Sequence, residues 1–378
     1  MDQLRQVVEA RVESGEVHGA AWLVDRAGDV SIGAAGAARP DSVFRISSVT
    51  KPVVARLAMT LVDDGLLRLD EPVDALLPEL AHRRVLRQPD GALDDTVPAE
   101  RPITVRDVLE FRLGLGMDFT GPFPGTVLGA LAERGLPMGP PAPQAAPAPD
   151  EWMRIVGAVP LSVQPGSRWL YNTGAQVLGV LASRAAGRPL PELLAERVLD
   201  PLGMTDTGFH VPPDRLDRFG PQWLGPEVYD EPAGQWAQPP AFPDAASGLV
   251  STVPDLHAFA ASLRDGSPST TTMRTARHGA HDADGTEGWG LGIGVMVADL
   301  PDGRHAGSYG WDGGLGSTWW TDPVTDTIAI LLTTDAWTSP QPSPVFTDFW
   351  RAAFSVSGGA PNPRSPRRGE RRPADPDR

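Results

Sequence analysis

The sequence places a serine and a lysine three residues apart, at Ser48 and Lys51. If a helix begins near Ser48, residues i and i+3 lie on one face of it, and the helix N-terminus favours negative charge on the serine oxygen. A serine hydroxyl is a weak nucleophile until a neighbouring base takes its proton. Lysine serves as that base only when neutral, so its pKa must fall from about 10.4 to about 7–8. The pair predicts a nucleophile with its base; the alternative is a surface lysine.

The composition makes Lys51 more informative. Of the 33 Lys+Arg residues it is the only lysine, and the chain is also rich in glycine and proline, with 41 and 40 residues. This composition is typical of GC-rich codon bias. A lysine that is retained under such bias is a candidate for a specific role.

A second polar pair is Tyr171 and Asn172. The chain has three tyrosines, and Asn172 is its only asparagine apart from Asn362. The pair comes just before a helix expected at Val177, where a polar cluster would face a cleft. A phenol near an ammonium is partly ionised and could relay the serine proton. The alternative is a turn in which Tyr171 packs and Asn172 caps the helix.

A third cluster, residues 307–317, contains five glycines around Trp311 and Asp312. Glycine allows a ligand to approach the backbone closely, and an exposed N–H can stabilise an oxyanion. The alternative is a glycine-rich hairpin without function. The cluster is not a phosphate loop, because neither G-x-G-x-x-G nor a Walker lysine occurs in the right context.

These clusters need a scaffold, and the hydrophobic pattern predicts one. Residues 1–15 have apolar residues at helical spacing, and residues 20–25 and 29–35 flank a short turn, as in a β-hairpin. From residue 51 to about 195 the spacing is mostly helical, with helices expected over 54–65, 105–109 and 177–187. Residues 137–149 contain six prolines and predict an extended loop.

Strand patterns return at 290–298, 316–321 and 327–334, and a helix is expected over 344–356. We therefore expect an α/β (α+β) fold: an antiparallel sheet closed by both chain ends, flanked by N- and C-terminal helices, with an inserted helical region. One domain is predicted over 1–357, with the sheet part at about 1–50 and 245–357 and the helical part at about 51–244. Residues 358–378, rich in Arg and Pro, are expected to form a disordered tail.

Composition also limits the function. The net charge of −15, with basic residues enriched only in the tail, argues against nucleic-acid binding. The chain has no run of 18 apolar residues and no signal-peptide pattern, so a cytoplasmic protein without a membrane span is expected. It has no cysteine, which excludes disulfides and a cysteine nucleophile but does not fix the redox compartment. His278 and His281 are expected to be solvent-exposed, and we expect neither a metal site nor a cofactor. The absence of G-x-S-x-G counts against an α/β-hydrolase.

Taken in order, the three clusters resemble the serine β-lactamase-like family, which includes class C β-lactamases, penicillin-binding D,D-peptidases and related esterases. Ser48 and Lys51 match its Ser-x-x-Lys motif, residues 171–173 lie where its Tyr-x-Asn belongs, and residues 311–313 lie where its Lys-Thr-Gly, His-x-Gly or Trp-x-Gly belongs. The similarity spans roughly residues 3–355.

The resemblance implies an acyl-enzyme on Ser48. Lys51 and Tyr171 would share base and acid duty, and the N–H groups of Ser48 and Gly314 would hold the oxyanion. At the second motif either Asn172 or Thr173 fills the polar role. Trp311, Asp312 and Gly313 are expected to border the substrate.

The third motif departs from the β-lactamase pattern. Because Lys51 is the only lysine, no Lys-Thr-Gly exists in this chain. The resemblance assigns that lysine to binding the substrate carboxylate, so its replacement by Trp311, beside Asp312 in an acidic chain, favours a neutral or cationic acyl substrate. The leading hypothesis is an esterase on small neutral acyl esters. The alternatives are an amide hydrolase (a β-lactamase or D-amino-acid peptidase), an acyltransferase of secondary metabolism, or a noncatalytic ligand-binding homologue. The acyl group, the acceptor and the oligomeric state stay open.

Overall fold

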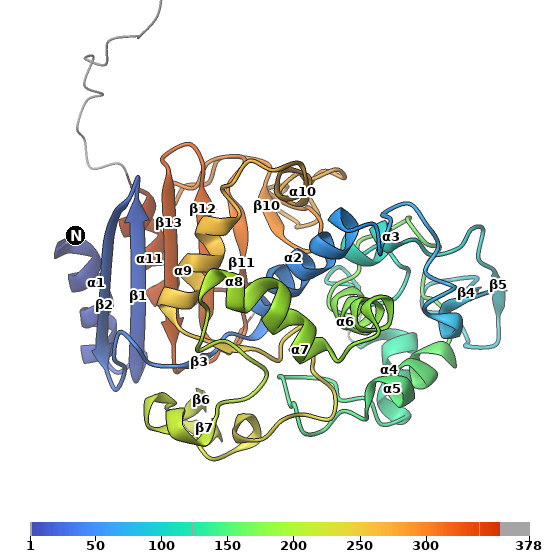
Figure 1. Cartoon of the computed structure of the whole chain (residues 1–378), viewed down its shortest axis with the longest axis horizontal. Helices are drawn as coiled ribbons and strands as arrows, with labels where there is room; N and C mark the ends of the chain where they lie inside the picture. The colour runs from blue at the N-terminus through green and yellow to red at the C-terminus, as the bar shows by residue number, and fades with distance from the viewer. Residues whose placement is uncertain (1, 122–123, 340, 356–378) are drawn as a thin grey trace, which may run out of the picture.

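The computed structural model describes residues 2–121, 124–339 and 341–355 (Figure 1). Its largest sheet has seven antiparallel strands in the order β2-β1-β13-β12-β11-β10-β9. The strands are β1 (Gly19–Arg26), β2 (Asp29–Gly36), β9 (Glu287–Trp289), β10 (Gly294–Met296), β11 (Tyr309–Gly313), β12 (Ser317–Asp322) and β13 (Thr327–Thr333). Because β1 pairs with β13, strands from both ends of the chain close one sheet, which confirms the expected fold class.

Helices from the two chain ends cover one face of this sheet, as Figure 1 shows for α1 (Asp2–Glu13) and α11 (Pro344–Phe354). Leu4 and Val8 of α1 are buried with Phe349 of α11 against Trp22 of β1. Side chains alternate between the faces of a strand. The next residue along β1, Leu23, therefore packs on the opposite face, in the main core with α2 (Thr50–Asp63) and α9 (Val253–Ser262).

The remaining elements lie between β2 and β9 in the sequence. The helices are α3 (Val105–Leu109), α4 (Gly125–Glu133), α5 (Pro149–Gly157), α6 (Thr173–Ala186), α7 (Leu190–Leu194), α8 (Asp200–Leu202) and α10 (Pro268–Met273). The short strands pair as β3 (Phe44–Arg45) with β8 (Val250–Ser251), β4 (Arg84–Leu86) with β5 (Thr96–Pro98), and β6 (Gln222–Leu224) with β7 (Glu227–Asp230). Figure 1 shows α3, α4, α5 and α6 beyond one side of the sheet.

One strand prediction was wrong in detail, and one strand was missed. Residues 290–298 were expected to form one strand, but Gly292 has a φ of +75° and the N–H of Gly290 bonds to the carbonyl of Ile293, so a turn separates β9 from β10. Residues 309–313, part of the glycine-rich cluster, form β11, for which no strand was predicted. Gly310 permits this pairing, because a Cβ there would lie 2.0 Å from the carbonyl oxygen of Trp319 on β12.

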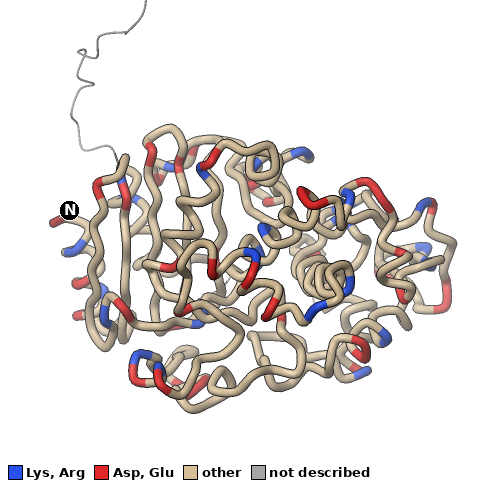
Figure 2. Tube along the Cα trace, in the orientation of Figure 1, with Lys and Arg blue, Asp and Glu red and all other residues tan. Residues whose placement is uncertain are grey.

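The predicted loop over 137–149 contains no helix or strand before α5 begins at Pro149. The predicted tail, residues 358–378, lies outside the described residues. Within the described ranges, no helix has the length and apolar character needed to cross a bilayer. Figure 2 shows basic and acidic residues interspersed along the described trace.

Candidate active site

Ser48 lies in a tight 3-10 turn, Ser47–Val49, that leads directly into α2. The sheet holds this turn through Ile46, whose carbonyl accepts a hydrogen bond from Ser317 Oγ of β12 at 2.7 Å. The N–H of Ile46 donates to the carbonyl of Leu249 at 3.1 Å. Ser47 has a φ of +46°, a backbone conformation that costs a non-glycine residue energy and that is enriched at functional sites. The position of Ser48 is therefore fixed from both sides.

Lys51, in the first turn of α2, points at Ser48. Its Nζ donates to Ser48 Oγ at 2.8 Å and to the carbonyl of Ala246 at 2.8 Å. The residue is only 1% exposed, and burial lowers the pKa of Lys51 to about 7, against a smaller opposing effect of Asp244. Near neutral pH a large fraction of Lys51 is therefore deprotonated, as a base for Ser48 must be.

A loop that sequence reasoning missed supplies the second partner of Lys51. Asp244 organises it: its Oδ1 accepts from the N–H of Ala246 at 2.7 Å, and its carbonyl accepts from the N–H of Gly248 at 2.8 Å. These bonds present the Ala246 carbonyl to Lys51. No local signal marks a backbone carbonyl 195 residues away, so this contact becomes visible only in the fold.

Tyr171 lies beside the pair. Its N–H and carbonyl both bond to Met117, at 2.8 and 2.9 Å, and the centre of its ring is 4.4 Å from Lys51 Nζ. Burial raises the pKa of Tyr171, and hydrogen bonds with Ser48 and Trp311 oppose that rise only in part. The expectation of a partly ionised phenol was wrong, because burial of the hydroxyl disfavours the phenolate.

The residues after Tyr171 form a strained turn. Asn172 has φ 79° and ψ −60°, and the N–H of Thr173 bonds to the carbonyl of Tyr171 at 3.1 Å, which closes a γ-turn. Thr173 is buried where α6 begins, and Asn172 is half-buried. Among the described contacts, neither side chain bonds to Ser48, Lys51 or Tyr171, so the geometry assigns the polar role of the second motif to neither.

The third motif lies on β11. Trp311 is 8% exposed and its Nε1 donates to the hydroxyl of Tyr171 at 2.8 Å. Asp312 points to the other face of the sheet, where it accepts from Thr318 Oγ1 and, at 2.9 Å, from Trp320 Nε1. Desolvation there raises the pKa of Asp312 to about 6. The expectation that Asp312 borders the substrate was wrong, because neighbouring residues of a strand face opposite sides.

The end of β11 abuts the Ser48 turn. A Cβ on Gly313 would lie 2.5 Å from the carbonyl oxygen of Ile46, so only glycine permits this approach. Gly314 follows at the exposed turn, and within the described residues its N–H has no hydrogen-bond partner. The N–H of Ser48 is in a first helical turn, where amides lack intrahelical partners. These two amides remain the candidate oxyanion donors.

Aromatic side chains that sequence reasoning missed surround Tyr171 and Trp311. The ring centre of Trp169 lies 5.6 Å from that of Tyr171, and Trp289 lies 4.6 Å from Trp311 at a steep angle. The expectation that His281 is solvent-exposed was wrong: its side chain is 10% exposed and stacks on Trp169 at 3.9 Å. His278 is 45% exposed and pairs with Glu110.

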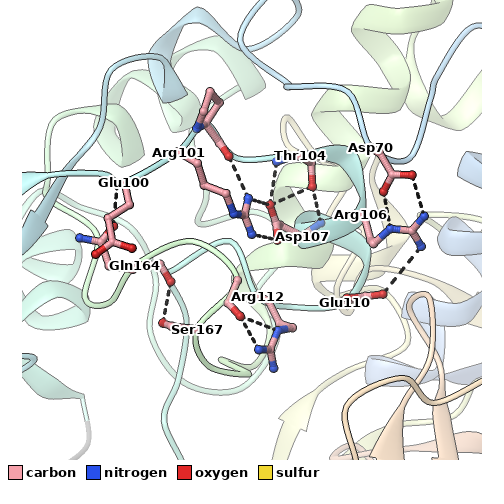
Figure 3. Close-up of polar contacts among 12 residues, drawn as sticks. Asp70, Glu100, Arg101, Thr104, Arg106, Asp107, Glu110, Arg112, Gln164 and Ser167 are labelled. Atoms are coloured by element: carbon pink, nitrogen blue, oxygen red, sulfur yellow. Dashed lines mark hydrogen bonds and ion pairs between the residues drawn. The ribbon is translucent and has the colours of Figure 1, made fainter.

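Helix α3 positions part of this aromatic wall. Thr104 and Asp107 form a reciprocal capping box at its start, and Arg101 binds the same carboxylate (Figure 3). At the other end of α3, the carbonyl of Leu109 accepts from Trp289 Nε1 at 3.0 Å. A helix of five residues is thereby fixed firmly enough to hold the Trp289 ring.

Comparisons with known proteins show the family to which the chain belongs. The Beta-lactamase family model matches residues 4–343, and the chain belongs to that family. It is 34% identical to Protein Rv1367c of Mycobacterium tuberculosis over 87% of this chain and 88% of that one. It is 30% identical to Esterase EstB of Burkholderia gladioli over 79% of each.

Among solved structures, the fold is similar to that of EstCE1, described as a hydrolase with promiscuous acyltransferase activity. The TM-score is 0.75, with 24% identity over 94% of this chain and 98% of that chain.

Proposed function

We propose that this protein is a serine esterase that forms an acyl-enzyme on Ser48 and acts on small neutral esters. The observation that carries the proposal is the buried Lys51 Nζ at 2.8 Å from Ser48 Oγ, in surroundings that lower its pKa to about 7. A base poised near the working pH is what a serine nucleophile requires. The family relationship and the esterase among the relatives support the same reaction class.

In acylation, Ser48 Oγ attacks the ester carbonyl carbon while Lys51 Nζ takes the hydroxyl proton. Negative charge develops on the carbonyl oxygen, where the N–H groups of Ser48 and Gly314 stabilise it. The bond to the alcohol oxygen then breaks, and the proton passes from Lys51 through the hydroxyl of Tyr171 to that oxygen. Water repeats the sequence on the acyl-enzyme and restores Ser48.

The preference for a neutral ester follows from the third motif. By the resemblance, Trp311 lies where related proteins have a lysine that binds the substrate carboxylate. Its side chain is an apolar ring, and its single N–H already donates a hydrogen bond to the hydroxyl of Tyr171. Lys51 is the only lysine in the chain, and it is committed to Ser48 and Ala246. An anionic substrate would therefore lack a lysine partner in this site.

Hydrolysis of p-nitrophenyl acetate by the purified protein tests the proposal. Ser48→Ala should lower kcat at least about a thousandfold, because no acyl-enzyme can form. Ser14→Ala, at an exposed serine after α1, is the matched control and should leave kcat unchanged. Unchanged turnover in Ser48→Ala would refute the proposal.

Nitrocefin turnover that rivals ester turnover would reassign the protein to the amide hydrolases. Failure of a fluorophosphonate to add mass at Ser48 would favour a noncatalytic homologue.

A further inference from the structure

A cavity of about 240 Å³ is lined by aromatic residues that neighbour Tyr171, although Ser48, Lys51 and Tyr171 do not line it themselves. Three of its walls are the rings of Phe119, Trp169 and Trp289. The ring centres of Phe119 and Trp169 lie 5.2 and 5.6 Å from that of Tyr171. The cavity is smaller than the roughly 300–1,000 Å³ that holds a whole drug-sized ligand, so its size suits one part of a substrate.

Two of the three walls, Trp169 and Trp289, are held in place before any ligand binds. Trp289 is fixed by its bond to the Leu109 carbonyl. Trp169 lies flat on His281, with 3.9 Å between ring centres and 25° between planes. Nε2 of His281 is 3.2 Å from a carboxylate oxygen of Glu287, which holds the imidazole against Trp169. Preformed flat walls favour a ring, because a ring buries a large apolar area against them with little loss of conformational entropy.

The carboxylates on the cavity wall, Glu110 and Asp118, are each paired with a basic residue, and Arg112 is held by a backbone carbonyl. Glu110 bonds to Nε2 of His278 at 2.7 Å, and Asp118 pairs with Arg168. Arg112 donates to the carbonyl of Gly166. A charged ligand would have to break one of these pairs, so the cavity favours a neutral group.

The position of Tyr171 decides which side of the ester enters the cavity. The group that returns the proton must lie next to the leaving oxygen, and Tyr171 has Phe119 and Trp169 as ring neighbours. The acyl carbonyl, in contrast, must face the amides of Ser48 and Gly314. The alcohol part of the ester therefore extends over Tyr171 toward the cavity.

We propose that this cavity is the alcohol subsite of the enzyme and selects esters whose alcohol carries a neutral ring system, with Trp169 as the specificity-determining residue and His281 as its positioning residue. The inference rests on the proposed esterase function. It predicts discrimination between ring-bearing and small alcohols that share one acyl group.

Three esters test this: 2-naphthylmethyl acetate has the ring on the alcohol, methyl 2-naphthylacetate has it on the acyl group, and ethyl acetate has none. Acid release is followed by titration. Trp169→Ala should lower kcat/KM for 2-naphthylmethyl acetate at least tenfold and change it for the other two esters less than threefold. His281→Ala should act in the same direction, mainly through KM, because it frees the Trp169 ring without touching the reacting atoms.

Trp223→Ala is the matched control, because Trp223 also stacks on a histidine, His18, at 4.0 Å. It should leave all three values of kcat/KM unchanged. With the unaltered protein, 2-naphthylmethanol should inhibit ethyl acetate hydrolysis competitively, a result that needs no variant to fold.

Equal losses for all three esters in Trp169→Ala, or a selective loss for methyl 2-naphthylacetate, would overturn the subsite assignment. Absence of competitive inhibition by 2-naphthylmethanol would do the same. In each of these outcomes ester hydrolysis would still require Ser48, so only the subsite assignment would fail. Ester hydrolysis that persists in Ser48→Ala would instead refute the esterase function itself.

Discussion

At the scale of single residues, the protonation of Lys51 controls whether Ser48 can be activated. Burial lowers the pKa of Lys51 to about 7, so kcat/KM should rise with pH and reach half its maximum near pH 7. Because Lys51 is the only lysine, a protein labelled with ¹³C-lysine gives one side-chain resonance set to titrate. We expect that titration to have its midpoint near 7; a midpoint above 10 would remove Lys51 as the base.

The lowered pKa of Lys51 also makes the free energy of unfolding depend on pH. In the unfolded chain Lys51 titrates near its ordinary value of about 10.4, so between pH 7 and 10.4 the unfolded state binds more protons than the folded state. The contribution of Lys51 to the free energy of unfolding therefore increases as pH rises through this window. It is smallest below pH 7, where both states are protonated.

At the scale of elements, the β11–β12 hairpin and the start of α2 hold each other in register. Ser317→Ala removes the bond to the Ile46 carbonyl, which still accepts from the N–H of Val49. We expect a loss of about 0.5–1.5 kcal/mol in the free energy of unfolding and a fall in kcat of about tenfold, because the Ser48 turn loses one support. Urea unfolding and p-nitrophenyl acetate kinetics measure the two effects.

Thr318→Ala is the control on the same strand, since Thr318 faces the other side of the sheet and bonds to Asp312. It should lower stability and leave kcat unchanged. If Ser317→Ala and Thr318→Ala affect kcat equally, the hairpin does not position the nucleophile.

At the scale of the whole molecule, the sheet separates a supporting layer, α1 with α11, from the layer that contains the site. Phe349 of α11 is fully buried in the supporting layer. Phe349→Ala should cost about 3–5 kcal/mol of unfolding free energy through lost burial and a cavity. At temperatures where the variant is folded, kcat should stay within twofold of the original. A tenfold lower kcat with an unchanged thermal midpoint would contradict this separation of roles.

Local periodicity was sufficient to predict the sheet-and-helix class, the hairpin of β1 and β2, and the helices α1, α2 and α11. These elements have strong patterns because each buries one face. Prediction failed at β9 and β11, where glycines interrupt the alternation that marks a strand. Glycine is present there because neighbouring backbones approach too closely for a Cβ, as at Gly310, and that constraint belongs to the packed sheet.

The sequence by itself determined which chemistry was available: Ser48 and Lys51 are three residues apart, and the single lysine excludes a second one at the third motif. Only the tertiary structure decided how that chemistry is tuned. The lowered pKa of Lys51 depends on its burial, the direction of its side chain depends on the carbonyl of Ala246, and the placement of Asp312 away from the site depends on which face of β11 packs toward Ser48. Residues far apart in the chain bury Lys51 and determine which face of β11 packs toward Ser48. No local pattern therefore encodes either property.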